Sequence, residues 1–155
     1  MRLYKFERLA ELTCSAIGDC TKLRRSSVTE SSCLTDHSLK KILMNVPDLE
    51  YLNLSACEGL TSGSLKHIPR LQRLRSLTLP HLEDDADGRS VALRSVGETR
   101  TLHYLDVGTI YRLSNLRDLT TLRDLRTLIV SAYTFSQPVS MRAQVICENF
   151  DKLDE

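Results

Sequence analysis

The sequence predicts an α/β fold made of stacked repeats: a short solenoid with parallel strands on its concave face and short helices on its convex face. A phrase of the form Leu-x-x-Leu-x-Leu, with substitutions in some copies, begins at Leu23, Leu49, Leu74, Leu102 and Leu125. The steps between copies are 26, 25, 28 and 23 residues, which is the spacing of stacked supersecondary units. Between the copies, apolar residues recur at helical intervals. These three patterns together predict about five repeats.

The 155 residues are predicted to form a single domain, 1–155, in three parts. Residues 1–22 hold an incomplete first repeat or an N-terminal helix, residues 23–133 hold the repeats, and residues 139–153 form a helix that caps the last repeat. The first repeat has no comparable cap, so a covering partner or a further stretch of chain is expected there. Because Trp is absent and aromatic residues are few, the core is predicted to be mainly aliphatic.

The elements at the start of the chain depart from the repeat pattern. A short, incomplete strand is expected over residues 3–6, followed by a helix that carries the apolar residues between Leu9 and Cys20. The first full strand runs from Leu23 to Val28, and Ser26 stands in it where the pattern has leucine. This first strand is therefore expected to be irregular.

The clearest helix and the clearest strand follow each other between residues 34 and 57. The segment Leu34-Thr35-Asp36 supplies a capping residue. An apolar stripe at i, i+3, i+4 and i+7 then predicts a helix through Leu39, Ile42, Leu43 and Val46. Pro47 ends the helix, because the residue before a proline avoids the helical conformation. In the following strand, Leu52 and Leu54 alternate with polar residues, so both leucines are expected to face inward.

The third repeat begins after an expected turn and a longer spacing. Thr61-Ser62-Gly63 is expected to form a turn before apolar residues at three-residue steps from Leu65 to Leu74, which predict a short helix or a tight helical turn. The acidic stretch 83–88 is expected to form an expanded solvent loop, which accounts for the 28-residue step. It does not fit a calcium-binding EF-hand loop, since Arg94 would stand where that loop has its bidentate Glu.

The last elements follow a looser pattern. Leu93 and Val96 precede a strand over residues 102–107, and leucines at three-residue steps from Leu113 to Leu128 predict a shortened helix or a 3₁₀-like segment. Ser140 is expected to cap the final helix, whose apolar residues are Met141, Val145, Ile146, Phe150 and Leu153.

The segment from Cys33-Leu-Thr-Asp36 through Pro47 to Leu49-Glu-Tyr-Leu52-Asn-Leu54-Ser-Ala-Cys57 resembles the cysteine-containing class of leucine-rich repeats. That class is best known from the substrate-receptor part of F-box ubiquitin-ligase subunits. The chain is similar, more weakly, to the mitochondrial ATP synthase coupling factor B proteins, which carry such repeats without an F-box. The resemblance implies a leucine-rich-repeat solenoid that recognises another protein.

The resemblance also implies a role for one cysteine. In this class, a Cys or Asn three residues after the last strand leucine lies inside the turn and satisfies the backbone of the coil. Cys57 holds that position, and the equivalent residues of the other repeats are Ser31, Leu82, Ile110 and Tyr133. Because this polar ladder is broken, a short arc is expected in place of a long, regular horseshoe.

Charge and cysteine content limit the classes of function. The net charge is +1, with 21 basic and 20 acidic residues, which gives no signal for a nucleic acid or an anionic membrane as partner. No apolar run is long enough to span a bilayer. The five cysteines have no paired spacing, so an intracellular, reducing compartment is predicted, either the cytoplasm or the mitochondrion.

Arginines are common between the leucine phrases and are expected on the solvated outer face of helices. A patch that binds phosphates or acidic groups is the alternative. These arginines are Arg70, Arg73, Arg75, Arg112, Arg117, Arg123 and Arg126.

No constellation of residues indicates catalysis, a metal or a cofactor. The four histidines lack metal-ligand spacing, and the six glycines form neither a phosphate loop nor a dinucleotide fingerprint. Cys57 is expected in the core, without a His and acidic partner close in sequence. The sequence therefore predicts that the protein is not an enzyme and needs no cofactor.

The candidate site is the exposed row of strand residues, because solenoids commonly bind partners on their concave sheet. Tyr51 and Tyr104 are expected in one column, two strands apart, where they would anchor a protein partner. The alternative is that this face is only solvated and the edges or helices bind. The predicted binding residues are Arg25, Thr29, Tyr51, Asn53, Ser55, Ser76, Thr78, Tyr104, Asp106, Thr127 and Ile129, and Ser27 is expected in the same row.

The sequence thus predicts a non-catalytic protein–protein interaction module, acting as a structural or adaptor subunit of a larger assembly. A mitochondrial complex is one such assembly. The alternative is the substrate-recognition part of an F-box-type ubiquitin-ligase receptor.

Overall fold

A computed structural model describes residues 2–4, 21–81, 86–110, 119–132 and 141–146. Seven strands within these ranges form one sheet in the order of the chain. Strands β1 to β6 are parallel, and β7 is antiparallel to β6. The strands are β1 (Arg2–Tyr4), β2 (Arg25–Thr29), β3 (Tyr51–Asn53), β4 (Ser76–Thr78), β5 (Tyr104–Ile110), β6 (Thr127–Ala132) and β7 (Met141–Ile146).

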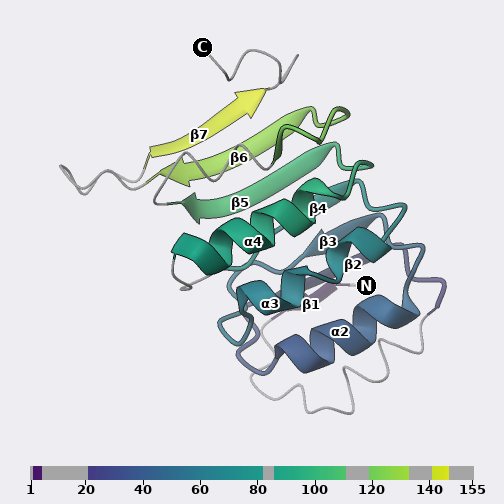
Figure 1. The fold of residues 1–155 in the computed structure, drawn as a ribbon. Helices are drawn as coiled ribbons and strands as arrows, with labels where there is room; N and C mark the ends of the chain where they lie inside the picture. Colours follow the sequence, from purple (N-terminus) through teal and green to yellow (C-terminus); the bar gives the residue numbers. More distant parts are fainter. Residues whose placement is uncertain (1, 5–20, 82–85, 111–118, 133–140, 147–155) are drawn as a thin grey trace.

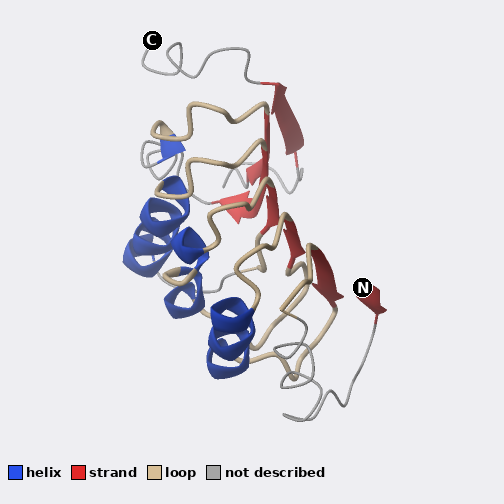
Figure 2. Ribbon diagram, turned by 90° about the vertical axis from the view of Figure 1, so that its right-hand side faces the viewer, coloured by secondary structure: helices blue, strands red, loops and turns tan. Residues whose placement is uncertain are grey.

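The helices pack against one face of the sheet, so the helices form one side of the molecule and the strands form the opposite side (Figures 1 and 2). They are α2 (Asp36–Asn45), α3 (Ser62–Leu65), the 3₁₀ helix η1 (Ile68–Arg70) and α4 (Ala86–Gly97). Each of these segments returns the chain from the end of one parallel strand to the start of the next. The predicted α/β architecture is confirmed: β1 to β6 are parallel, and the described helices, which all lie between β2 and β5 in the chain, cover one face of the sheet.

The core between the strands and the helices is aliphatic, as predicted. Leu52, Leu77, Leu105 and Leu128 occupy equivalent positions on neighbouring strands and are all fully buried. Burying a leucine side chain contributes about 2 kcal/mol, so a continuous leucine row supplies much of the stability of such a stack. Fully buried leucines of the return segments include Leu39, Leu43, Leu65, Leu71, Leu119 and Leu122.

Helix α2 begins and ends where the sequence predicts. Thr35 is its N-cap: the Ser38 backbone N–H donates to the Thr35 hydroxyl over 3.4 Å, and the Thr35 backbone N–H donates to Ser38 Oγ over 2.9 Å. This reciprocal capping box satisfies backbone N–H groups that have no partner within the helix. The helix ends at Asn45, two residues before Pro47.

Two segments expected to be turns or loops are helical. Thr61 is the N-cap of α3, and Gly63 lies inside that helix, so the predicted Thr61-Ser62-Gly63 turn is wrong. Asp87 and Gly88, placed by the sequence in an expanded loop, lie in the first turn of α4. The 28-residue step therefore accommodates a helix of 12 residues. Residues 83–85 of the acidic stretch lie outside the described ranges.

Residues 141–146 form a strand, so the predicted capping helix over 139–153 is wrong there. β7 pairs with β6 from Thr127 opposite Ile146 to Ala132 opposite Met141. The edge of β6 presents unpaired N–H and C=O groups, which a strand satisfies and a helix cannot. From Met141 to Val145 the sequence also alternates apolar and polar residues, the period of a strand. The rest of the predicted helix lies outside the described residues.

The described part of the last return segment, from residue 119 on, has the predicted 3₁₀-like character. Backbone N–H groups of Leu122 and Leu125 donate to the carbonyl groups of Leu119 and Leu122, a 3₁₀-like spacing. The predicted helix between residues 9 and 20 and the leucines before residue 119 lie outside the described ranges. In the described part of the chain, no helix has the length and apolar character needed to cross a bilayer.

Candidate functional site

The strand register assembles the predicted row of side chains. Tyr51 lies between Arg25 and Ser76, and Ser76 is followed by Tyr104 and Thr127. Tyr51 and Tyr104 thus share one column, two strands apart, as the sequence predicts. Since neighbouring strands are about 4.8 Å apart, the two tyrosine positions are separated by about 10 Å, with the small Ser76 between them.

The two tyrosines are half-buried, and one of them has a cation against its ring. The guanidinium carbon of Arg25 lies 4.9 Å from the centroid of the Tyr51 ring. A cation over an aromatic face is attracted by the ring's quadrupole, which holds the ring in one orientation. Arg25 itself is exposed, so this pair faces solvent at one end of the column.

A second column runs beside the first and is less available. It contains Ser27, Asn53, Thr78, Asp106 and Ile129. Ser27 is 8% exposed and Asp106 is 7% exposed, so the predicted exposure of these two residues is wrong. The remaining three are half-buried.

Two polar residues of the second column hydrogen-bond to the backbone just beyond them, Asn53 at the end of β3 and Asp106 at the irregularity within β5. Asn53 Oδ1 accepts from the Ser55 backbone N–H over 2.9 Å, and Asp106 Oδ1 accepts from the Gly108 N–H over 3.0 Å. Both are local bonds to the backbone two residues further on, a habit of Asn and Asp at turns. Gly108 has a φ of 63°, which favours glycine, at the irregularity in β5. The side-chain oxygen of Asn53 and one carboxylate oxygen of Asp106 are therefore already used in hydrogen bonds that stabilise the fold.

The two remaining predicted residues lie at the end of β2 and just beyond the end of β3. Thr29 is half-buried and pairs with Tyr4 of β1. Ser55 is half-buried, and its carbonyl accepts from the Glu30 backbone N–H over 3.1 Å. The turn just beyond them is where Cys57 lies.

Cys57 satisfies the backbone of the preceding repeat, as the resemblance implies. It is fully buried, and its thiol donates to the Val28 carbonyl over 3.2 Å. Burial raises the pKa of this thiol, and a backbone hydrogen bond with Ser31 acts in the opposite direction. A buried, protonated thiol is a hydrogen-bond donor and a poor nucleophile.

Ser31 occupies the equivalent turn one repeat earlier and leaves its hydroxyl unsatisfied. Its Oγ is buried and has no hydrogen-bond partner, although Ser31 is only 1% exposed. The residues just before the two turn positions, Glu30 and Ala56, have φ values of 54° and 55°. The two turns therefore share a backbone path and differ in how the polar side chain is used.

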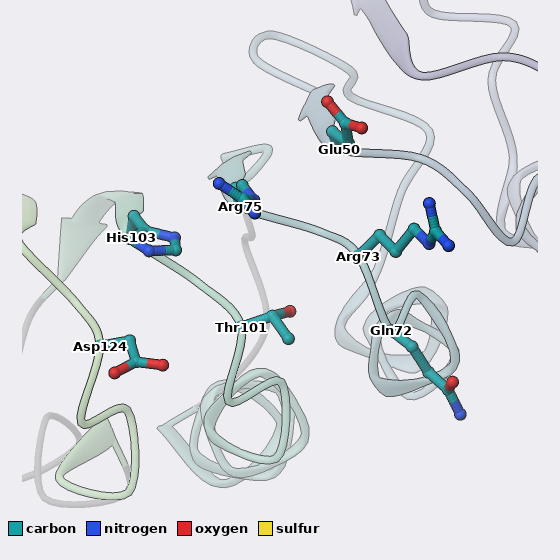
Figure 3. Close-up of a pocket in the computed structure, with 7 residues that line it drawn as sticks. All are labelled: Glu50, Gln72, Arg73, Arg75, Thr101, His103 and Asp124. Atoms are coloured by element: carbon teal, nitrogen blue, oxygen red, sulfur yellow. The ribbon is translucent and has the colours of Figure 1, made fainter.

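A polar groove lies along the edge where the parallel strands begin, a feature that the sequence analysis does not identify. The backbone bonds of the sheet place Glu50, Arg75, His103 and Arg126 in a row just before β3, β4, β5 and β6. Figure 3 shows Arg75 and His103 at the starts of neighbouring strands. A hollow of about 350 Å³ is lined there by Glu50, Gln72, Arg73, Arg75, Thr101, His103 and Asp124.

A second hollow continues the groove. It measures about 650 Å³ and is lined by Arg100, Thr120, Thr121, Arg123 and Asp124. Asp124 lines both hollows. A signal for this edge exists in the sequence, since the residue directly after the first leucine of each phrase recurs with the repeat and is Arg in three of the five copies, Arg24, Arg75 and Arg126.

Several of the arginines that recur between the leucine phrases lie at this edge. Arg73 and Arg75 line the first hollow, Arg123 lines the second, and Arg126 stands in the row before β6. Arg70 ends helix η1, and Arg112 and Arg117 lie outside the described residues. Among the described residues, no three His, Cys, Asp or Glu side chains gather in a way that could hold a metal ion.

The fold is similar to solved structures of low sequence identity. The C-terminal domain of tropomodulin from Caenorhabditis elegans matches with a TM-score of 0.55 and 13% identity, over 83% of this chain and 84% of that chain. An internalin from Listeria monocytogenes matches with a TM-score of 0.46 and 21% identity, over 79% of this chain and 39% of that one. No family model matches the sequence. The likeness to the tropomodulin domain supports a fold of the leucine-rich-repeat type.

Proposed function

We propose that this chain is a non-catalytic protein–protein interaction module, built as a short leucine-rich-repeat solenoid and acting as a structural or adaptor subunit of a larger assembly. The observation that carries the proposal is the column of Tyr51, Ser76 and Tyr104 on neighbouring strands. Its binding face is the sheet surface opposite the helices, the concave face of the proposed solenoid.

The partner is proposed to contact this column directly. Two half-buried tyrosines flank a small serine at a separation of about 10 Å, enough for one inserted side chain of a partner. Tyrosine anchors interfaces well because it buries much area at a low entropy cost and keeps a hydroxyl for hydrogen bonding. The Arg25 contact orders Tyr51 before binding, which lowers the cost of association. Thr127 and Ile129 extend the face toward β7.

The proposal is tested by replacing both tyrosines with alanine. Tyr51→Ala with Tyr104→Ala should weaken partner binding by about 2 kcal/mol or more, roughly 30-fold, and leave the fold intact. The binding partner is first captured by crosslinking and affinity purification from the native source. Its affinity for purified wild type and variant is then measured by calorimetry, and far-UV circular dichroism reports the fold.

The matched control lies on the helix side. Met44 is 55% exposed and Val91 is 62% exposed, so Met44→Ala with Val91→Ala removes similar apolar area from the opposite face. This control should bind the partner as the wild type does. Loss of binding in the control alone would assign the interface to the helices and contradict the proposal.

A non-catalytic role is supported by the state of the one described cysteine in the turn. The Cys57 thiol is buried, protonated and used as a donor to Val28. The proposed compartment is intracellular and reducing, the cytoplasm or the mitochondrion, in which a thiol of this kind stays reduced. Turnover that is lost when a single Cys or His is replaced would contradict this part of the proposal.

A second function is favoured by the same contact. The Cys57–Val28 bond is the arrangement expected of the repeat class that recognises substrates for F-box ubiquitin ligases. In that case the chain is the substrate-recognition part of such a receptor. Sequencing the complete reading frame from the native source separates the two functions, since only the receptor requires an F-box segment.

A further inference from the structure

We propose that the strand-start edge, defined as Arg75, Arg100, His103, Arg123, Asp124 and Arg126, is a second binding surface that takes an acidic segment of a protein. It is separate from the tyrosine column, which lies on the face of the sheet. The edge recognises aspartate and glutamate side chains of the partner, which are separated by neutral residues in the partner's sequence.

The edge follows from the parallel order of the strands. All parallel strands begin on the same side, so the residues just before them form a row at strand spacing of about 4.8 Å. Backbone N–H groups of Arg75, His103 and Arg126 donate to the carbonyls of Glu50, Arg75 and His103, which places these residues one strand apart in turn. Arg75 and Arg126 therefore lie on either side of His103, and their backbone positions are about 10 Å apart.

The arginines of this edge carry no ion pair with any other described residue, unlike two arginines beside it. Arg24 is bonded to Glu50 at 2.7 Å, and Arg73 lies 3.2 Å from Asp48. Within the described residues, no ion pair reaches Arg75, Arg100, Arg123 or Arg126, and all four are exposed. An exposed guanidinium presents a planar fork that matches a carboxylate through two parallel hydrogen bonds.

The acidic residues of the groove decide between a peptide and a nucleic acid. Asp124 lines both hollows, so it lies between Arg75 on one side and Arg100 with Arg123 on the other. A polyphosphate backbone carries a charge at every unit and would meet repulsion at Asp124. A peptide with spaced acidic side chains can place a neutral residue or a backbone N–H there. The chain's net charge of +1 agrees with a local patch and not with general attraction to polyanions.

The test selects short random peptides, displayed on phage, against the purified full chain. The wild type should enrich peptides richer in Asp and Glu than the input library, with neutral residues between the acids. The double variant Arg75→Gln with Arg126→Gln should lose this enrichment and bind the selected peptides at least tenfold more weakly. Raising the salt from about 0.05 M to 0.5 M should weaken binding of the wild type as well.

Two control variants separate this surface from a general effect of charge and from the tyrosine column. Lys40→Gln with Lys41→Gln removes the same charge from exposed positions of α2, away from the edge, and should keep the acidic enrichment. The double variant Tyr51→Ala with Tyr104→Ala should also keep it, because the column is a different surface. Circular dichroism melting confirms that each variant is folded.

The choice of ligand class is tested with oligothymidylate. It should bind the wild type more weakly than the selected peptides do, and Asp124→Asn should strengthen its binding. Peptides no more acidic than the input, enrichment that survives Arg75→Gln with Arg126→Gln, or tighter binding of oligothymidylate than of peptides would each overturn the proposal.

Discussion

The repeat over residues 23–48 and the repeat over residues 49–73 occupy equivalent places in the stack but use different residues in them. The first has Ser26 inside its strand where the second has Leu52, and both residues are buried. The first continues into α2, with 10 residues, whereas the second continues into α3, with four residues, and η1. The positions are shared, and the chemistry that fills them is not.

The segments after the two strands differ most in their hydrogen bonds: those of the second repeat reach back to the first. Cys57 donates to the Val28 carbonyl, and the Thr61 hydroxyl and N–H donate to the Asp36 carboxylate over 2.5 and 2.9 Å. Each contact joins the second repeat to the first. The Ser31 hydroxyl, in the same place one repeat earlier, has no partner. The comparison teaches that a repeat in such a stack is stabilised largely by what its neighbour offers.

The largest expected effect contrasts the two strands. Leu52→Ala should lower the free energy of unfolding by roughly 2 to 5 kcal/mol, because it empties a fully buried position between β2 and β4. Ser26→Ala, in the register position beside it, removes a single hydroxyl and should cost less than about 1.5 kcal/mol. Urea denaturation measures both. Equal losses would mean that the serine position contributes as much as the leucine.

The next effect concerns a glycine in the second turn. A β-carbon at Gly59 would lie 2.6 Å from the Leu34 carbonyl oxygen and 3.1 Å from that of Ser32. Because both obstacles are backbone atoms of the first repeat, Gly59→Ala should cost about 1 to 3 kcal/mol. Cys33 is its counterpart in the first repeat and already carries a side chain, so Cys33→Ala should cost less than about 1 kcal/mol. Thermal melting measures both variants. A Gly59→Ala variant that melts at the wild-type temperature would show that the backbone does not approach Gly59 this closely.

The smallest effect contrasts the two turn side chains directly. Cys57→Ala leaves the Val28 carbonyl without its donor and should destabilise the protein by about 1 to 2 kcal/mol. Ser31→Ala removes a buried hydroxyl that has no partner, so it should be neutral or stabilise by up to about 1 kcal/mol. Both are measured by urea denaturation at neutral pH. A loss of stability in Ser31→Ala that matches Cys57→Ala would end the distinction between the turns.

The strands were predictable because leucine alternation and repeat length act together. Leu52 and Leu54 face the core as their spacing indicates, and the register that aligns Tyr51 with Tyr104 follows from equivalent positions in the repeats. Segments set by the fold as a whole were not predictable. Gly63 is compatible with a turn by its own preference, but the Thr61 cap and the packing of Leu65 place it in a helix. At β7, hydrogen bonding to the edge of β6 decided the structure.

The candidate site was predictable in outline only. Alternation assigns Asp106 to the outward side of its strand, but the irregularity of β5 and the bond to Gly108 turn its carboxylate toward the backbone and bury it. The groove at the strand-start edge cannot be predicted from strand periodicity, because its residues lie outside the strands. Arg75 and His103 directly precede β4 and β5, and Asp124 lies in the return segment before β6. Periodicity identifies the faces of a strand, whereas an edge emerges only when the strands are placed side by side.

Helix α4 shows where this architecture can change in length. It has 12 residues where α3 has four, yet Leu77 still pairs with Leu105 just as Leu52 pairs with Leu77. The return segments thus absorb insertions without moving the residues that the strands present. A lineage of such chains could add or lose a helical turn on one side while the opposite surface changes only by substitution. Separate surfaces of one small protein can in this way diversify by independent routes.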